Sequence, residues 1–146
     1  MQVPRLVVRS VMTGLQLVRR AYWRMTGLKG RGVHAVALTP SGEVVLVRLS
    51  YAPGWRLPGG GRGRREEEEA AMLRELREEI GLVAHGPVER AAGGPGRRGY
   101  FVVRDVRYRP SRNFEIEEVR AFAPGALPPD MPRGDRGVIE QALASA

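Results

Sequence analysis

Apolar residues fall into short blocks through the first half of the chain, with turn-forming residues between them. Residues 33–38 and 44–49 are two such blocks, and the four residues between them, Thr-Pro-Ser-Gly at 39–42, favour a tight turn. This pattern predicts two strands joined by a turn. His34 is the one titratable residue in the first block, and an isolated His provides neither a metal cluster nor a catalytic triad. We therefore interpret His34 as structural.

A helical pattern follows the next short apolar block, residues 55–57. Pro58 ends that block, and the three glycines after it allow the backbone to approach a ligand closely. From residue 66 to residue 80 nearly every residue is a strong helix former, and Gly81 stands where helices commonly end. At about 100° per residue, one stripe of this helix is apolar and is expected to pack on the core. Its members are Met72, Leu73, Leu76 and Ile80.

Three carboxylates lie together on the adjoining stripe of this helix, because residues three and four apart are neighbours there. They are Glu75, Glu78 and Glu79. Like charges so close together repel one another, which favours a bound cation, and Mg²⁺ and Mn²⁺ prefer oxygen ligands. The alternative is a solvated helix face on which Arg74 and Arg77 pair with glutamates four residues away. The helix alone leaves both interpretations open.

The spacing of the whole stretch favours the metal site. Gly60 is followed, after five residues, by Glu66, and Glu66 is followed, after seven, by Arg-Glu-Leu-Arg-Glu-Glu-Ile-Gly-Leu at 74–82. This spacing matches, at every fixed position, the signature box of the Nudix hydrolases, and the chain therefore resembles that family. The resemblance implies an α/β protein of the Nudix fold, with a mixed β-sheet sandwiched between α-helices, over residues 28–146.

One part of the box departs from the usual family sequence. Family members often carry an acidic residue and a Gly just before the first Glu, where this chain has Gly63, Arg64 and Arg65. The loop is therefore more basic than is usual in the family. We expect its substrate contacts to differ accordingly, while every fixed position of the box is filled.

The activity that the resemblance implies is hydrolysis of a phosphoanhydride bond in a nucleoside diphosphate linked to another moiety. A nucleoside triphosphate, ADP-ribose or a nucleotide sugar would be such a substrate, so the expected partner is a small-molecule nucleotide, without a stable nucleic-acid complex. The implied cofactor is Mg²⁺, for which Mn²⁺ can substitute. The implied metal ligands are the Gly60 carbonyl and the carboxylates of Glu75, Glu78 and Glu79.

The box also contains the first candidates for catalysis. Glu78 or Glu75 could deprotonate the attacking water. Arg74 lies next to one box glutamate and four residues before another, so its expected role is to hold a carboxylate in position. Glu66 stands at the start of the helix and is expected to order the loop.

Two further groups of candidates lie outside the helix. Some family members take the general base from a later loop, and here the residues of that kind are Glu115, Glu117 and Glu118. Solvent-facing strand positions would explain them equally well. The substrate-binding candidates, which could hold phosphate oxygens or stack on a base, are Arg64, Arg65, Arg56 and Tyr51. The remaining aromatic residues considered for stacking fit the core better: Trp55, Tyr100, Phe101 and Phe122.

The second half of the chain alternates short strands with loops. Strands are expected within residues 83–92, 100–106 and 114–122. In the last of these the apolar residues change parity between Ile116 and Val119, which predicts a bulge or bend. Asp135 is expected to cap a final helix that runs through Leu143.

The first 27 residues form a pattern of their own. Apolar residues recur at steps of three and four with arginines on the other faces, which predicts an amphipathic helix within residues 1–27. We expect its apolar stripe to pack on the domain or on a twin subunit in a homodimer, with an anionic lipid surface as the alternative. Arginines interrupt any long apolar core in this segment, so neither a signal peptide nor a transmembrane segment is expected.

Composition adds a strong positive charge. The 146 residues include 24 Lys and Arg against 16 Asp and Glu, a formal net charge of +8, which favours anionic partners. Lys29 is the one lysine, so a general preference for Arg explains the basicity as well as a function does. The chain has no Cys, which excludes disulfides, thiolate metal sites and a cysteine nucleophile, and fits the cytoplasm, where we expect the protein.

Two other nucleotide-binding classes do not fit the glycine loop. A P-loop requires Gly-Lys-Ser/Thr after the glycines, and a dinucleotide fingerprint requires Gly where this chain has Arg64. The alternative from another class is a basic nucleic-acid-binding module, and a capped-RNA hydrolase would combine both activities. The arginines are spread along the chain instead of forming a continuous track, which favours the small nucleotide.

Overall fold

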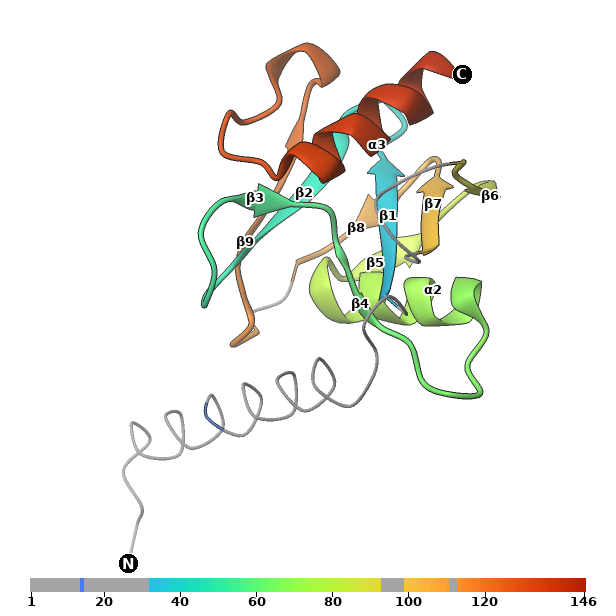
Figure 1. Cartoon of the computed structure of the whole chain (residues 1–146), viewed down its shortest axis with the longest axis vertical. Coiled ribbons are helices and arrows are strands. Elements are labelled where there is room, and N and C mark those ends of the chain that lie inside the picture. Colours follow the sequence, from blue (N-terminus) through green and yellow to red (C-terminus); the bar gives the residue numbers. More distant parts are fainter. Residues whose placement is uncertain (1–13, 15–31, 93–98, 111–112) are drawn as a thin grey trace, which may run out of the picture.

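The computed structural model describes Gly14 and residues 32–92, 99–110 and 113–146. The helix predicted within residues 1–27 therefore lies outside the described residues except at Gly14, which is helical. The elements, in chain order, are β1 (Gly32–Leu38), β2 (Val44–Leu49), β3 (Trp55–Arg56), β4 (Gly59–Gly61), α2 (Glu68–Glu79), β5 (Leu82–Ala84), β6 (Val88–Arg90), β7 (Gly99–Val103), β8 (Arg107–Tyr108), β9 (Ile116–Phe122), a 3₁₀ turn η1 (Pro124–Ala126) and α3 (Arg133–Ala144) (Figure 1).

A mixed sheet of seven strands forms the centre of this arrangement. Five strands follow the order β3-β2-β1-β7-β6, while β4 also pairs with β1 and β9 also pairs with β2. The β1–β7 pair is parallel, and the other pairs in this sheet are antiparallel. Strands β5 and β8 form a separate two-stranded sheet. The prediction of a mixed sheet is therefore confirmed.

Strand β1 is the element that brings the glycines into place, because two strands share one of its edges. Its end at residues 32–34 pairs with β4, and its other end, at Ala37 and Leu38, pairs with β2. Between β3, which pairs with β2, and β4, which pairs with β1, the Pro58 carbonyl accepts a hydrogen bond from the Ala35 N–H at 3.0 Å. Pro58 lacks an N–H but keeps this acceptor, so it ends β3 without leaving β1 unpaired.

Helices α2 and α3 cover opposite faces of the sheet, as the alternation of buried side chains along β1 requires. Val33, Ala35 and Ala37 lie in one core cluster with α2, and Val36 and Leu38 lie in the other cluster with α3. The predicted packing stripe of α2 is confirmed. Met72, Leu76 and Ile80 are fully buried, and Leu73 is partly buried. No helix in the described ranges is long and apolar enough to cross a bilayer.

The ends of several elements differ from the sequence prediction. Helix α2 begins at Glu68, later than expected, while its end is confirmed: Gly81 follows with φ 71°. A Cβ there would lie 1.9 Å from the Arg109 carbonyl oxygen, so this position also requires Gly for space. Residues 83–92 hold parts of two strands, β5 and β6, in different sheets. The local pattern could not separate strands this short.

The bulge predicted in β9 is confirmed. Arg48 of β2 is opposite Glu118, whereas the next residue, Leu49, is opposite Ile116. Glu117 is therefore the extra residue, and it moves the apolar side chains on either side of it to a common face of the sheet.

The expected role of Asp135 is wrong. Helix α3 begins at Arg133, with Pro132 in the capping position and no side-chain capping bond. Asp135 lies in the first turn, is 8% exposed, and accepts a hydrogen bond from the Leu57 N–H at 3.0 Å. Pro132 suits a helix start because its φ is already helical. Asp135 is therefore available to join α3 to the segment that leads into β4.

We predict that Asp135→Ala destabilises the protein by about 1–3 kcal/mol, because it leaves the buried Leu57 N–H without that acceptor. Asp135→Asn keeps an acceptor oxygen and should lose less, and Glu140→Ala, an exposed position on the same helix, should change little. Urea unfolding of the three variants and the parent measures the difference. Equal stability of Asp135→Ala and Glu140→Ala would contradict this role.

Candidate active site

The centre of the site is the contact between the glycine strand β4 and helix α2. A Cβ on Gly60 would lie 2.6 Å from the carboxyl carbon of Glu75, and a Cβ on Gly59 would lie 2.1 Å from the Val33 carbonyl oxygen. Any larger residue at either position would displace the backbone or the carboxylate. The glycines are therefore required for the strand to fit between β1 and the acidic face of α2.

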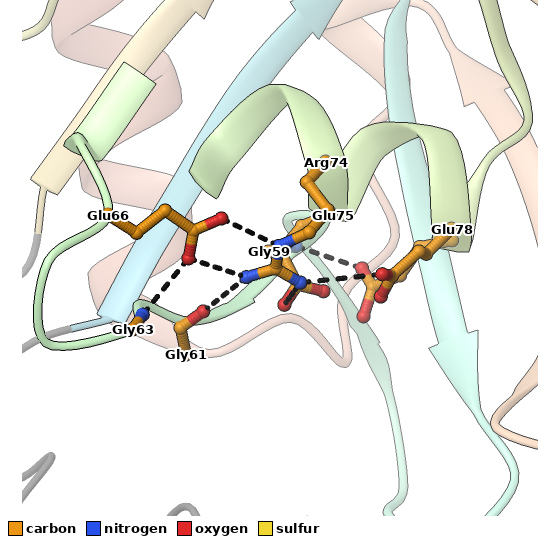
Figure 2. A network of polar contacts seen from close by, with 8 residues as sticks. Gly59, Gly61, Gly63, Glu66, Arg74, Glu75 and Glu78 are labelled. Carbon is orange, nitrogen blue, oxygen red and sulfur yellow. Dashed lines mark hydrogen bonds and ion pairs between the residues drawn. The ribbon is translucent and has the colours of Figure 1, made fainter. Parts of the chain in front are cut away.

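Arg74 joins this acidic face to the loop that precedes the helix. Its Nε and Nη2 atoms donate to the two carboxylate oxygens of Glu66, at 2.8 and 3.1 Å, and Nη2 also donates to the Gly61 carbonyl at 2.9 Å. Its Nη1 atom lies 3.0 Å from Glu75 Oε1 and 3.5 Å from Glu78 Oε1. Figure 2 shows the guanidinium between Glu66 and the box glutamates. All three guanidinium nitrogens are engaged, so Arg74 positions carboxylates and the glycine strand.

These contacts shift two pKa values. The hydrogen bond to Glu66 is the main cause that raises the pKa of Arg74 above its ordinary value. The same bond lowers the pKa of Glu66, and the Gly63 N–H, which donates to Glu66 Oε2 at 3.0 Å, lowers it further. Glu66 is therefore ionised at neutral pH and holds the loop and Arg74 together.

Glu75 and Glu79 are the buried carboxylates of the site. They are 7% and 3% exposed, and Glu79 Oε2 accepts a hydrogen bond from the Gly59 N–H at 2.9 Å. Burying two carboxylates on adjacent turns is costly unless positive charge or hydrogen bonds compensate. Arg74 supplies part of that charge to Glu75. A small cation bound at this place would offset the charge of both carboxylates further.

The third box carboxylate points differently. The Glu78 side chain is 50% exposed and lies near Arg74 Nη1. Among the residues that the structure describes, no three Asp, Glu, His or Cys side chains converge as a ready metal site. The donor set nevertheless fits Mg²⁺, because carboxylate and carbonyl oxygens are the ligands that this hard cation prefers. Glu78 has the solvent access to join the two buried carboxylates.

The loop arginines occupy the tip of a fixed turn. The Glu66 N–H donates to the Gly63 carbonyl at 3.2 Å, and the Glu66 side chain accepts from the Gly63 N–H. Arg64 and Arg65 are the two central residues and are exposed. A turn closed in this way leaves both arginine side chains exposed to solvent, next in sequence to Glu66 of the carboxylate network. Their contact with substrate stays a prediction.

The two remaining substrate candidates lie in different surroundings. Arg56 is partly buried on β3 and its Nη2 atom donates to the Pro53 carbonyl at 3.1 Å. Tyr51 is partly buried and packs against the core cluster beneath α2. Neither position tests substrate binding, so both assignments stay predictions.

Asn113 is a residue of this region that the sequence reasoning missed. Its Nδ2 atom donates to the Glu78 carbonyl at 3.0 Å, and its Oδ1 atom accepts from the Glu115 and Ile116 N–H groups at 2.7 and 2.9 Å. The segment before β9 is therefore attached to the last turn of α2. Asn is favoured in such side-chain to backbone turns, which is the signal that could have found it.

The three loop glutamates separate clearly. Glu117 and Glu118 pair with Arg48, at 3.3 and 2.9 Å, and Glu118 also pairs with Arg120. Glu115 belongs to the segment that Asn113 attaches to α2, and it is partly buried. Only Glu115 of the three is thus tied by neighbouring bonds to the helix that carries the box.

The aromatic residues that the sequence assigned to the core lie in it or against it. Trp55, Tyr100 and Phe101 are 6%, 1% and 5% exposed. Phe122 meets Trp55 edge to face, with ring centroids 4.9 Å apart. His34 stacks on Tyr100 at 5.5 Å between centroids, which agrees with its structural interpretation.

Comparison with known proteins agrees with this geometry. The model of the NUDIX domain family matches residues 28–142, and the chain therefore belongs to the Nudix family. An RNA pyrophosphohydrolase from Hahella chejuensis (strain KCTC 2396) is 36% identical over 77 residues, which are 53% of this chain and 42% of that protein. The match thus spans less than half of that relative.

Solved structures show the same fold. The MutT NUDIX hydrolase from Burkholderia pseudomallei is 27% identical, with a TM-score of 0.59, and the match covers 75% of this chain and 95% of that chain. The NUDIX domain of Shewanella oneidensis NrtR, solved with ADP ribose, is 22% identical, with a TM-score of 0.59 and coverage of 78% and 86%. The α/β sandwich predicted from the sequence is confirmed by these neighbours.

The lowered pKa of Glu66 predicts a pH-dependent contribution to stability. A carboxyl group with a folded-state pKa below its ordinary value of 4.5 stabilises the protein fully above that pH, and the stabilisation is lost as pH falls through the lower folded-state pKa. Glu66→Gln should therefore be less stable than the parent at pH 7, and the difference should shrink at pH 3. Urea unfolding at both pH values measures it, with Glu69→Gln, an exposed position on α2, as control. A pH-independent difference would rule out this charge effect.

Proposed function

We propose that this protein is a metal-dependent hydrolase of phosphoanhydride bonds in small nucleotides. The substrate is a nucleoside diphosphate linked to another moiety, such as a nucleoside triphosphate, ADP-ribose or a nucleotide sugar. The observation that supports this most directly is the pair of buried carboxylates, Glu75 and Glu79, set against Gly59 and Gly60 in a complete Nudix box. Family membership gives the reaction class its support.

The residues proposed to hold Mg²⁺ or Mn²⁺ are Glu75, Glu78, Glu79 and the Gly60 carbonyl. When bound, the metal would neutralise phosphate charge and lower the pKa of a coordinated water. Arg74 keeps Glu75 in place and lies within 3.5 Å of Glu78. Its bonds to Glu66 and Gly61 hold the glycine strand at a fixed distance from α2. The protein therefore holds the carboxylates of the proposed metal site in position before a metal binds.

Phosphate groups of the substrate would bind positively charged side chains beside these carboxylates. Arg64 and Arg65 are exposed at the tip of the Gly63–Glu66 turn, where phosphate oxygens can reach both. Guanidinium groups bind phosphate oxygens through paired hydrogen bonds. A substrate with two or more adjacent phosphates uses this charge better than a phosphomonoester does.

We assign the deprotonation of the attacking water to Glu115. Its segment is attached through Asn113 to the last turn of α2, the helix that carries the box carboxylates. Glu75 is the weaker candidate, because it is buried and bonded to Arg74. Glu78 remains the alternative base within the helix. A carboxylate on a separate segment can accept a proton while the helix carboxylates hold the metal.

A second candidate substrate is the 5′ end of an RNA. The Hahella chejuensis relative is an RNA pyrophosphohydrolase, and a 5′-terminal triphosphate offers the same phosphoanhydride bonds as a free nucleotide. The small nucleotide remains the first choice, because long RNA needs a continuous basic track for affinity.

One experiment tests the substrate class and the metal together. The purified full chain with Mg²⁺ is incubated with nucleoside triphosphates, ADP-ribose, nucleotide sugars, capped RNA and 5′-triphosphorylated RNA, and the products are identified by mass. We expect cleavage between phosphates of a small nucleotide, and none in EDTA. Cleavage confined to RNA would select the second candidate, and tight RNA binding without any cleavage would favour a binding module instead.

Glu79→Gln should lower turnover by about 100-fold or more, because it removes one negative ligand, while the helix persists since Gln is nearly as good a helix former. Glu69→Gln, on the same helix and exposed, is the matched control. Steady-state kinetics on the best substrate, with melting temperatures for both variants, measure the effect. Unchanged turnover in Glu79→Gln would contradict the assignment of Glu79 as a metal ligand.

Removal of the Glu115 carboxylate, the proposed general base, should lower kcat. Glu115→Gln is expected to lower kcat by about 100-fold or more with little change in KM, since removing a general base costs on that order. Glu117→Gln, in the same segment, is measured beside it. A loss of kcat in Glu117→Gln without one in Glu115→Gln would assign the base to Glu117 instead, and unchanged kcat in both would leave the base within the helix.

A further inference from the structure

We infer that Phe114 is the aromatic platform on which the base of the nucleotide substrate stacks. This rests on the proposed function, since it names the part of the substrate that the carboxylates and the loop arginines do not contact. Phe114 differs from the aromatic side chains of the core, because it is exposed on the surface.

Exposure is the first observation. Phe114 is 40% exposed, and in the described part of the chain Val83 is the one other large apolar residue with comparable exposure. The other aromatic candidates for stacking pack in or against the core: Tyr51, Trp55, Tyr100, Phe101 and Phe122. An exposed phenyl ring offers a flat apolar face, and every nucleobase has a π-face that can stack on one.

Rigidity is the second observation. The Ser50 hydroxyl donates to the Phe114 carbonyl at 2.7 Å, and the Ser50 N–H donates to the Glu115 carbonyl at 2.9 Å. On the other side, Asn113 Oδ1 accepts from the N–H groups of Glu115 and Ile116. An aromatic residue left in solvent by chance needs no such fixation. A stacking platform benefits from it, because less conformational entropy is lost when the ligand binds.

Position is the third observation. Asn113, the residue before Phe114, bonds the carbonyl of Glu78 in the box helix at 3.0 Å. Glu115, the residue after it, is the proposed base. Phe114 thus lies on a segment attached to the last turn of the box helix, and the nucleoside part of a substrate would extend over it once its phosphates reach α2. A neutral ring gives affinity for the base without a fixed hydrogen-bond pattern, so we expect weak discrimination among bases.

The test compares ligands with and without a base. Isothermal titration measures binding of the four nucleoside 5′-monophosphates and of ribose 5-phosphate to the full chain and to Phe114→Ala, Phe114→Tyr and Val83→Ala. We expect Phe114→Ala to weaken binding of all four nucleotides by about tenfold and to leave ribose 5-phosphate unchanged. Phe114→Tyr should keep the affinity, and Val83→Ala, which alters the other exposed apolar residue, should match the parent. Melting temperatures show that the variants are folded.

Kinetics extend the test. On the best substrate of the panel, Phe114→Ala should raise KM by about tenfold with kcat within twofold of the parent, as expected for lost ground-state binding. Unchanged nucleotide affinity in Phe114→Ala, or an equal loss for ribose 5-phosphate, would overturn the inference. If the parent hydrolyses nothing on the panel, the proposed function fails, while the titration still decides whether Phe114 binds a base.

Discussion

The structure depends on the close approach of a glycine strand to an acidic helix face. Glu75 and Glu79 are buried against Gly59 and Gly60, where a side chain on either glycine would collide with its surroundings. Two buried carboxylates are costly in isolation, and Arg74 offsets part of that cost while binding Glu66 and the Gly61 carbonyl. The fold therefore keeps two carboxylates buried side by side, with Arg74 and the glycine strand helping to stabilise them.

The sheet is arranged so that this approach can occur. β1 pairs along one edge with β7, and shares its other edge between β4 and β2. The sharing places the glycines in the sheet itself instead of in a free loop, and the helix packs on the sheet through Met72 and Leu76. Core packing and site geometry are thus set by the same contacts, because the apolar and acidic stripes of α2 are adjacent.

Local sequence patterns were sufficient to predict much of the secondary structure. The apolar blocks predicted β1 and β2, the periodicity of α2 predicted its buried stripe, and the parity change predicted the bulge at Glu117. The contacts that the sequence did not predict join residues far apart in the chain, such as Asp135 with Leu57 and Asn113 with Glu78. Nothing in the residues beside Asp135 specifies a partner in another segment. The position of a loop against the site is therefore learned from the tertiary structure alone.

The turn between Gly63 and Glu66 has an evolutionary consequence. It is closed by the backbone bond between these two residues and by the Glu66 carboxylate, and Arg64 and Arg65 take no part in the closing bonds that the structure describes. Substitution at these two positions removes none of the bonds that close the turn. Single mutations in descendants of this chain can therefore exchange the charge of the turn while its closing bonds are inherited unchanged.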